Sequence, residues 1–277
     1  MANFQYLRKW TLIAEGGGSG LDLSRLRCTF KVEKKDTQTP NTAEFKIYNI
    51  AHTTAGDLKK SFTKVLSSAG YESNFGLIFS GNIKGFKETK EGTETVLTLE
   101  AGDGDEAYNY TVINKTLAAG ATPDSIVSEV SGAMGVGVGF KSSLPSTALP
   151  RGKVFYGRPC EYMREQADNT GCTWSIQDGQ ILLLKRTEVA AGSAVLLSPK
   201  TGLIGLPEAN EDGIKAKCLL NPMLKIGSAV EIESKYASEL NGQYRLISIT
   251  HTGDTRGNDW YSEFAALRIN GSSVSEK

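Results

Sequence analysis

Runs in which apolar and polar side chains alternate limit the possible folds of this chain more than any other feature. Residues 26–33 and 43–48 both show this pattern, with a polar, turn-forming stretch at 36–41 between them. A period of two is typical of a β-strand that buries one face and exposes the other. Further short strands are predicted at 75–79, 83–88 and 95–100, and apolar residues at helical spacing predict one short helix over 58–66. Many short strands separated by Gly-rich turns favour a β-barrel or β-sandwich.

The middle of the chain has a different pattern, in which helices dominate. Thr122 can cap a helix that begins at Pro123 and ends by Gly135. A second helix is predicted to begin near Pro159, and a β-hairpin should follow over residues 172–184. Two helices and a hairpin within a short span predict a compact α/β insertion.

The C-terminal third returns to short strands. They are predicted at 195–197, 214–220, 229–233, 244–250 and 263–269. The chain is therefore expected to consist of a β region, an α/β insertion and a second β region.

Composition narrows the classes of function. Lys+Arg 31 against Asp+Glu 31 gives a formal net charge of zero, which disfavours general nucleic-acid binding but leaves a local basic patch open. The N-terminus lacks the apolar core of a signal peptide, and no stretch approaches the roughly 20 apolar residues of a membrane span. The cysteines Cys28, Cys160, Cys172 and Cys218 form no Cys-x-x-Cys pair, as expected of small buried hydrophobes in a reducing compartment. The prediction is a soluble protein made in a cytoplasm.

Two short clusters could in principle carry chemistry. Residues 103–106 (DGDE) suggest a calcium loop, but Ala107 stands at the next ligand position, so a solvated connector is favoured. His251, Asp254 and Arg256 could form an acid–base site, but no Gly-x-Ser-x-Gly elbow completes a hydrolase, and a turn between two strands, which explains this stretch without any chemistry, is favoured.

The remaining clusters have simpler interpretations. Glu208, Glu211 and Asp212 are interpreted as an exposed acidic loop, because clustering in sequence does not establish a sugar cleft. The glycine-rich segments 16–20 and 135–139 lack the Gly-Lys-Ser/Thr ending of a phosphate loop and are interpreted as flexible turns. No catalytic, cofactor-binding or metal-binding residue is predicted, no cofactor is expected, and the partner-binding residues are not identified.

Several fragments, in this order and spacing, resemble the baseplate hub proteins of contractile-tailed bacteriophages. They are residues 39–49 (TPNTAEFKIYN), 79–83 (FSGNI), 101–105 (AGDGD), 151–157 (RGKVFYG), 201–207 (TGLIGLP), 219–222 (LLNP) and 251–260 (HTGDTRGNDW). Related hubs occur in type VI secretion spikes and in phage-tail-like bacteriocins.

The resemblance implies a mainly β protein with two similar β-barrel domains, at 1–105 and 189–277, flanking a small α/β domain at 106–188. It implies a homotrimer whose six barrels form a pseudo-sixfold ring between the hexameric tail tube and the trimeric central spike. DNA would pass through the lumen without specific binding, and channel-facing residues should not be strongly basic. A tape-measure protein is a further candidate partner. The expected location is the virion tail baseplate, after assembly in the host cytoplasm.

The resemblance implies a structural protein and not an enzyme, but two other functions stay open at this point. One is a tail-associated glycan or peptidoglycan hydrolase that uses carboxylates such as Glu161 or Asp254. The other is a monomeric carbohydrate-binding module built from the β regions. Substrate cleavage would favour the first, and glycan binding by a solution monomer would favour the second.

Overall fold

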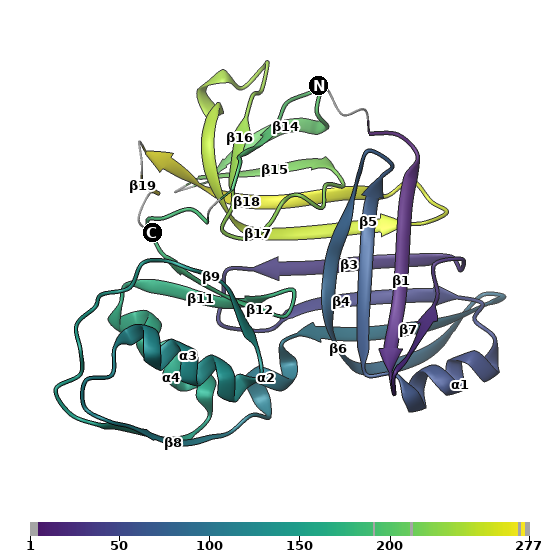
Figure 1. Ribbon diagram of the computed structural model, residues 1–277. Coiled ribbons are helices and arrows are strands. Elements are labelled where there is room, and N and C mark those ends of the chain that lie inside the picture. Colours follow the sequence, from purple (N-terminus) through teal and green to yellow (C-terminus); the bar gives the residue numbers. More distant parts are fainter. Residues whose placement is uncertain (1–4, 191, 211–212, 271–272, 275–277) are drawn as a thin grey trace.

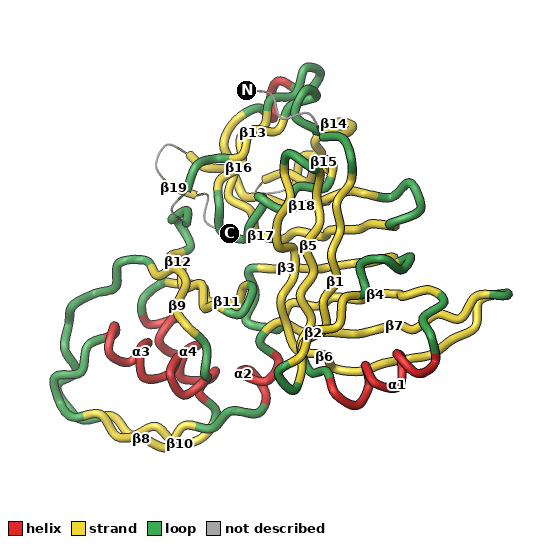
Figure 2. The backbone as a smooth tube through the Cα atoms, turned by 45° about the vertical axis from the view of Figure 1, so that its right-hand side comes forward, coloured by secondary structure: helices red, strands yellow, loops and turns green. Residues whose placement is uncertain are grey.

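The computed structural model describes residues 5–190, 192–210, 213–270 and 273–274 and is mainly β (Figures 1 and 2). Most strands belong to one sheet with the order β14-β15-β18-β17-β3-β4-β7-β6-β5-β1-β2. This path is open at both ends, so the pairings among the described residues close neither of the two predicted barrels. Among these residues no helix is long and apolar enough to cross a bilayer.

The first β unit is built from two layers of one folded sheet. Its elements are β1 (Arg8–Gly16), β2 (Ser19–Asp22), β3 (Cys28–Lys35), β4 (Asn41–Tyr48), α1 (His52–Ser61), β5 (Lys64–Tyr71), β6 (Asn74–Glu91) and β7 (Glu94–Asp103). The long β6 pairs with β5 through its first half and with β7 through its second half. It therefore carries the chain from one layer to the other, and β1 and β5 cross over β3 and β4 (Figure 1).

The predicted helix in this unit was placed too far along the chain. Helix α1 ends at Ser61, whereas Val65 and Leu66 belong to β5. The chain is already extended at Phe62, and Val65 is buried while Leu66 is only half-buried, as expected for a strand. A short apolar run is compatible with both periods, and here pairing with β1 and β6 selects the strand.

The insertion contains α2 (Asp105–Asn109), β8 (Ile113–Leu117), α3 (Pro123–Met134), β9 (Gly137–Lys141), β10 (Lys153–Gly157), α4 (Pro159–Asn169), β11 (Cys172–Gln177) and β12 (Gln180–Lys185). The predicted start of α3 is confirmed, because the Thr122 hydroxyl accepts a hydrogen bond from the Ser125 N–H at 3.3 Å. Gly135 ends α3 with φ 67°, the left-handed conformation that glycine adopts most easily. Gly137 and Gly139 are not a flexible turn, since they lie in β9, which pairs in parallel with β12.

The second β unit contains β13 (Val195–Leu197), β14 (Leu203–Asn210), β15 (Gly213–Leu219), β16 (Ala229–Ile232), the short 3₁₀ helix η1 (Ser238–Leu240), β17 (Gly242–Asp254), β18 (Trp260–Asn270) and β19 (Ser273–Val274). The two β units are joined by antiparallel pairing of β17 with β3, from Ser248 opposite Lys35 to Asp254 opposite Thr29. They therefore share one uninterrupted sheet.

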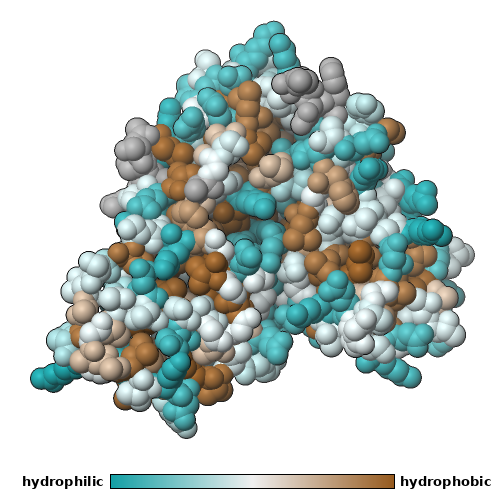
Figure 3. Space-filling model, in the orientation of Figure 1, coloured by the Kyte–Doolittle hydropathy of each residue, from teal (hydrophilic) through white to brown (hydrophobic). Residues whose placement is uncertain are grey.

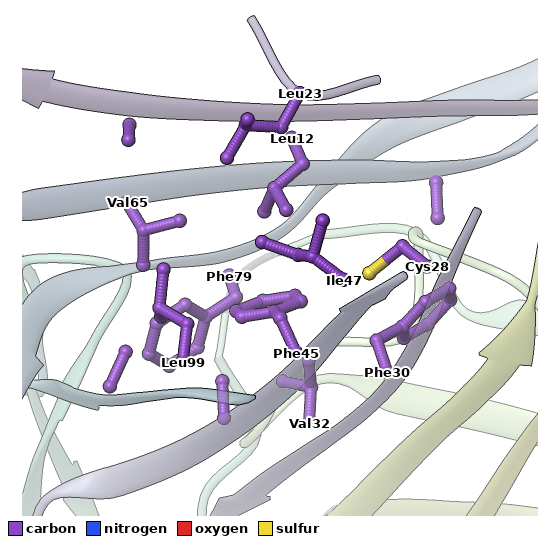
Figure 4. Packing of buried hydrophobic residues seen from close by; sticks show 14 of the residues in the cluster. Leu12, Leu23, Cys28, Phe30, Val32, Phe45, Ile47, Val65, Phe79 and Leu99 are labelled. Carbon is purple, nitrogen blue, oxygen red and sulfur yellow. The ribbon is translucent and has the colours of Figure 1, made fainter. Parts of the chain in front are cut away.

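Buried side chains form three hydrophobic clusters. The first fills the space between the layers of the first β unit, where Phe45, Phe79 and Leu99 point toward one another (Figure 4). The second surrounds Trp174 between α3, α4 and the β11–β12 hairpin, and the third lies within the second β unit. The four cysteines are buried and free, as their scattered positions predicted.

An aromatic group lies at the seam between the two β units. Trp10 stacks on Phe30 with ring centroids 4.6 Å apart, and Trp260 meets the same Phe30 ring edge-on at 5.4 Å. Trp260 belongs to β18 of the second unit, yet it is buried in the first cluster, and its Nε1 donates to the Gly70 carbonyl at 3.3 Å. Gly253 leaves room for these rings, because a Cβ there would lie 2.4 Å from Phe30 Cζ.

Candidate functional site: the polar face of the joined sheet

One face of the sheet that joins the two β units is mainly polar. In β3, Cys28, Phe30 and Val32 are buried and the alternating side chains point to the opposite face. Side chains directly opposite each other in an antiparallel pair lie on the same face. The pairing registers place Thr250 opposite Glu33 and Glu263 opposite Thr250, so this face continues from the first unit into the second.

We call this surface, formed by the outward side chains from β14 to the second half of β6, the polar face. Its basic residues are Arg27, Lys31, Lys35, Lys46, Lys87, Lys215 and Lys217. Its acidic residues are Glu33, Glu44, Glu91, Glu94, Glu100, Glu208, Asp254 and Glu263. Hydroxyl groups from Thr29, Thr42, Thr98, Ser248, Thr250 and Thr252 lie between the charges. The two signs of charge are close to balanced.

Four lysines of the polar face, Lys31, Lys35, Lys46 and Lys217, lie beside a carboxylate. Glu33 pairs with Lys31 at 2.5 Å and with Lys35 at 3.7 Å, and Lys217 pairs with Glu263 at 2.9 Å. The hydrogen bond from Lys31 holds the pKa of Glu33 below its usual value, and the hydrogen bond to Glu263 raises the pKa of Lys217. Exposed pairs of this kind add little stability. Their effect is to cancel the positive field of each lysine locally.

A groove of about 570 Å³ opens on the polar face at its β14 edge. It lies where the register of β14 against β15 shifts between Ile204 and Glu208. The protruding Leu206 is 57% exposed, and Lys215, Lys217 and Glu263 line the same groove. The edge of the sheet is therefore bulged and mixed in character. On the side of the molecule drawn in Figure 3, hydrophobic patches are likewise interrupted by polar side chains.

The acid–base arrangement of His251 and Asp254 that the sequence analysis considered is not formed. His251 lies on the core face of β17, where its Nδ1 is 2.8 Å from the Ser262 hydroxyl, and burial lowers its pKa to about 3. Asp254 lies on the opposite face, 3.0 Å from the Arg27 guanidinium. Burial alone would raise the pKa of Asp254, but the hydrogen bonds from Arg27 and from the Arg256 and Gly257 backbone lower it. A carboxylate on one side of a strand cannot orient a base on the other.

The segment 103–106 is not the solvated connector that was expected. Asp103 is fully buried and accepts hydrogen bonds from the backbone N–H groups of Asp178 at 2.5 Å and Gly179 at 2.9 Å. Burial, together with the nearby charge of Asp178, raises the pKa of Asp103 to about 6. Asp105 is paired with Lys84 at 2.8 Å. These carboxylates hold the insertion to the first β unit.

The described part of the chain contains no group of three or more His, Cys, Asp or Glu side chains placed to hold a metal ion.

Other candidates from the sequence are dispersed. Glu208 is an exposed residue of β14 beside Lys215, and Glu211 and Asp212 lie outside the described residues. Glu161 is an exposed residue in the first turn of α4. Since α4 belongs to the insertion and Asp254 to the second β unit, the two carboxylates proposed for a hydrolase lie in different parts of the molecule.

A buried ion pair that no local sequence motif indicates ties three parts of the molecule together. The Arg245 guanidinium on β17 donates to the Asp36 carboxylate of the β3–β4 loop, and both side chains are almost completely buried. Arg245 also donates to the Arg186 carbonyl at 2.8 Å, and Thr173 of β11 donates to Asp36 at 3.3 Å. Burial raises the pKa of Asp36 and lowers that of Arg245. Residues 36 and 245 are too far apart in sequence for any local motif to relate them.

His251 and Asp103 are expected to change stability in opposite directions as the pH falls. The folded pKa of His251 is about 3, against about 6.5 when unfolded. Between these values the unfolded chain binds more protons, so acidification destabilises the fold. The folded pKa of Asp103 is about 6, against about 3.9 when unfolded. Acidification through that window therefore stabilises the fold, and each effect is at most about 1.4 kcal/mol per pH unit.

Single variants separate these two effects. As the pH falls from about 6.5 to about 4.5, the free energy of unfolding of His251→Gln should increase and that of Asp103→Asn should decrease. The free energy of unfolding of the unmodified protein should change less than either. The measurement is the free energy of unfolding in urea at several pH values in that range. Equal slopes in all three proteins would contradict the assignment of these two groups.

Comparisons with known proteins agree with this architecture. A family model described as baseplate hub gp41 matches residues 22–266. The fold is similar to the 43 kDa tail protein of prophage MuSo2 from Shewanella oneidensis, with TM-score 0.65 and 10% identity over 96% of this chain and 99% of that chain. It is also similar to the tail protein from Neisseria meningitidis MC58, with TM-score 0.64 and 8% identity over 95% and 97%.

A third similar structure is the E. coli c3393 protein, described as a component of the type VI secretion system with structural similarity to the T4 tail proteins gp27 and gp5. The TM-score is 0.63 with 11% identity, over 98% of this chain and 79% of that chain. At these identities the likeness establishes the fold alone. No curated protein sequence gives a significant match.

Proposed function

Because the chain belongs to the baseplate hub gp41 family, we propose that it is the structural hub of a phage tail baseplate and acts as a homotrimer. Three copies form a pseudo-sixfold ring that joins the hexameric tail tube to the trimeric central spike and encloses the DNA channel. The protein is a component of the virion tail, and its partners are the tube and spike proteins, with a tape-measure protein as a further contact.

The observation that carries this proposal is the pairing of β17 with β3, which places two β units side by side in one sheet. Three chains with two such units each present six positions around an axis, as a junction between sixfold and threefold partners requires. A ring needs contacts between different faces of neighbouring copies, because only such contacts close under rotation. The three hydrophobic clusters lie mainly within 1–105, 106–188 and 189–277, which supports a division into these units, with the middle unit decorating the ring or facing the spike.

We propose a structural role without catalysis. The residues that a hydrolase would use are separated, and His251 is held neutral in the core. The buried carboxylates Asp36 and Asp103 are engaged in holding the three parts of the chain together. These contacts suit a component that has to stay rigid under load.

The mass of the purified protein in solution tests the proposal. Light scattering should give about three times the 29.8 kDa of one chain, either for the protein alone or after co-expression with the tube and spike proteins. Electron micrographs of that species should show a ring. A protein that stays monomeric in the presence of both partners would contradict the hub assignment.

A further inference from the structure

We propose that the polar face is the wall of the enclosed channel, and that its pairing of lysines with carboxylates keeps double-stranded DNA from binding as it passes. This inference rests on the proposed function. It adds which residues face the DNA and why they do not retain it.

Layer geometry selects this face. In the first β unit, the opposite face of β3, β4 and β7 is covered by β1 and β5, and buried residues fill the space between the layers. In the second unit, the residues opposite the polar face, such as Ile249 and Phe264, are buried in the third hydrophobic cluster. The polar face is the side that both units leave uncovered, and β17–β3 pairing makes it continuous between them.

The chemistry of this face is suited to a polyanion that has to slide. A protein binds duplex DNA chiefly by neutralising phosphates with lysine and arginine, and each such contact releases counterions. Here Lys31 and Lys35 share Glu33, Lys46 lies 3.8 Å from Glu44, and Lys217 lies 2.9 Å from Glu263. These four lysines already have a carboxylate beside them, so a phosphate would have to compete with that carboxylate.

The uncharged side chains of the polar face do not favour retention of DNA either. Threonine and serine hydroxyls such as those of Thr250 and Thr252 can bind water or phosphate only weakly and without net charge. On this face the rings of Tyr48 and Tyr261 lie beneath cations, Arg27 at 4.6 Å and Lys217 at 4.5 Å from the respective ring centroid. Their rings are therefore covered and cannot serve as platforms on which exposed bases stack.

The test removes carboxylates from the polar face and asks whether DNA then becomes trapped inside the ring. The variant Glu44→Gln, Glu100→Gln, Glu263→Gln leaves Lys46 and Lys217 without their partners at exposed positions. The matched control is Asp124→Asn, Glu129→Gln, Glu165→Gln on the insertion, which deprives Lys141, Lys115 and Lys153 of their partners in the same way. Both variants gain the same charge.

The probe is one small plasmid, either closed circular or cut once, with retention measured by gel shift at low salt. Only a DNA with free ends can thread a preformed ring. The polar-face variant should therefore bind the cut plasmid at least about tenfold more tightly than the closed one, and added salt should remove the binding. The control variant should bind both forms alike, and the unmodified protein should retain neither.

Two kinds of failure are distinguishable. Light scattering on each protein, alone or assembled with tube and spike proteins, first establishes whether a ring of three chains is present. Absence of that ring contradicts the hub proposal itself. A ring whose polar-face variant binds closed and cut plasmid equally, or binds no better than the control, contradicts only the assignment of the channel wall.

Discussion

Replacing Trp260 by alanine is expected to lower the free energy of unfolding by about 3–5 kcal/mol, among the largest costs of any single substitution in this chain. The side chain is 1% exposed and lies against Phe30 in the first hydrophobic cluster. Removing it leaves a cavity and deprives the Gly70 carbonyl of a hydrogen bond at 3.3 Å. The two β units would then meet across a void at the seam, which the rigid sheet around it can fill only partly.

Urea unfolding of the purified variant measures this cost. The control is Tyr261→Ala, the next residue on β18, whose half-buried side chain lies on the polar face. We expect the control to cost about 1 kcal/mol or less. A Trp260→Ala variant as stable as this control would show that the seam does not contribute to the stability of the fold.

The single replacement of Arg245 by alanine is expected to lower the free energy of unfolding by about 3–5 kcal/mol, because it leaves the buried Asp36 carboxylate without a counter-charge. The double variant Asp36→Ala, Arg245→Ala should be less destabilised than the sum of the two single variants, since it removes the uncompensated charge. Burial already raises the pKa of Asp36. Acidification should therefore restore part of the stability of Arg245→Ala by neutralising Asp36.

The pH series of unfolding free energies checks this second expectation. An exposed pair gives the control: Lys217→Ala removes the partner of Glu263 on the polar face, and its cost should stay below about 1 kcal/mol. Additive costs of the two buried residues, with no recovery at low pH, would mean that Asp36 and Arg245 do not act as a pair.

The sequence predicted local structure well where a few neighbouring residues determine it. The cap at Thr122, the stop at Gly135 and the hairpin over β11 and β12 all depend on contacts within one or two turns of chain. Strand β14 was missed because Gly205 and Pro207 interrupt its alternation. The helix over 58–66 was extended into β5 because its apolar run fits both periods.

The polar face could not be located from the sequence, because it depends on pairing between distant strands. The individual alternations in 26–33 and 244–250 were visible, but nothing in either segment shows that β3 and β17 are neighbours. Proximity in sequence also suggested a His251–Asp254 site that strand geometry forbids. The family resemblance predicted the class of protein, whereas the residues of the polar face became known only from the pairing registers of the strands.

Strand β12 has a consequence for any attempt to simplify or extend this protein. Its side chains alternate between two cores: Ile181 and Leu183 enter the cluster of the insertion, and Leu182 and Leu184 enter that of the second β unit. A shortened chain from which the insertion is excised would lose Leu182 and Leu184 and so expose the hydrophobic core of the second β unit. The insertion and the second β unit therefore have to be kept together. Foreign segments should instead be grafted at residues 145–148, an exposed loop between β9 and β10 that neither core requires.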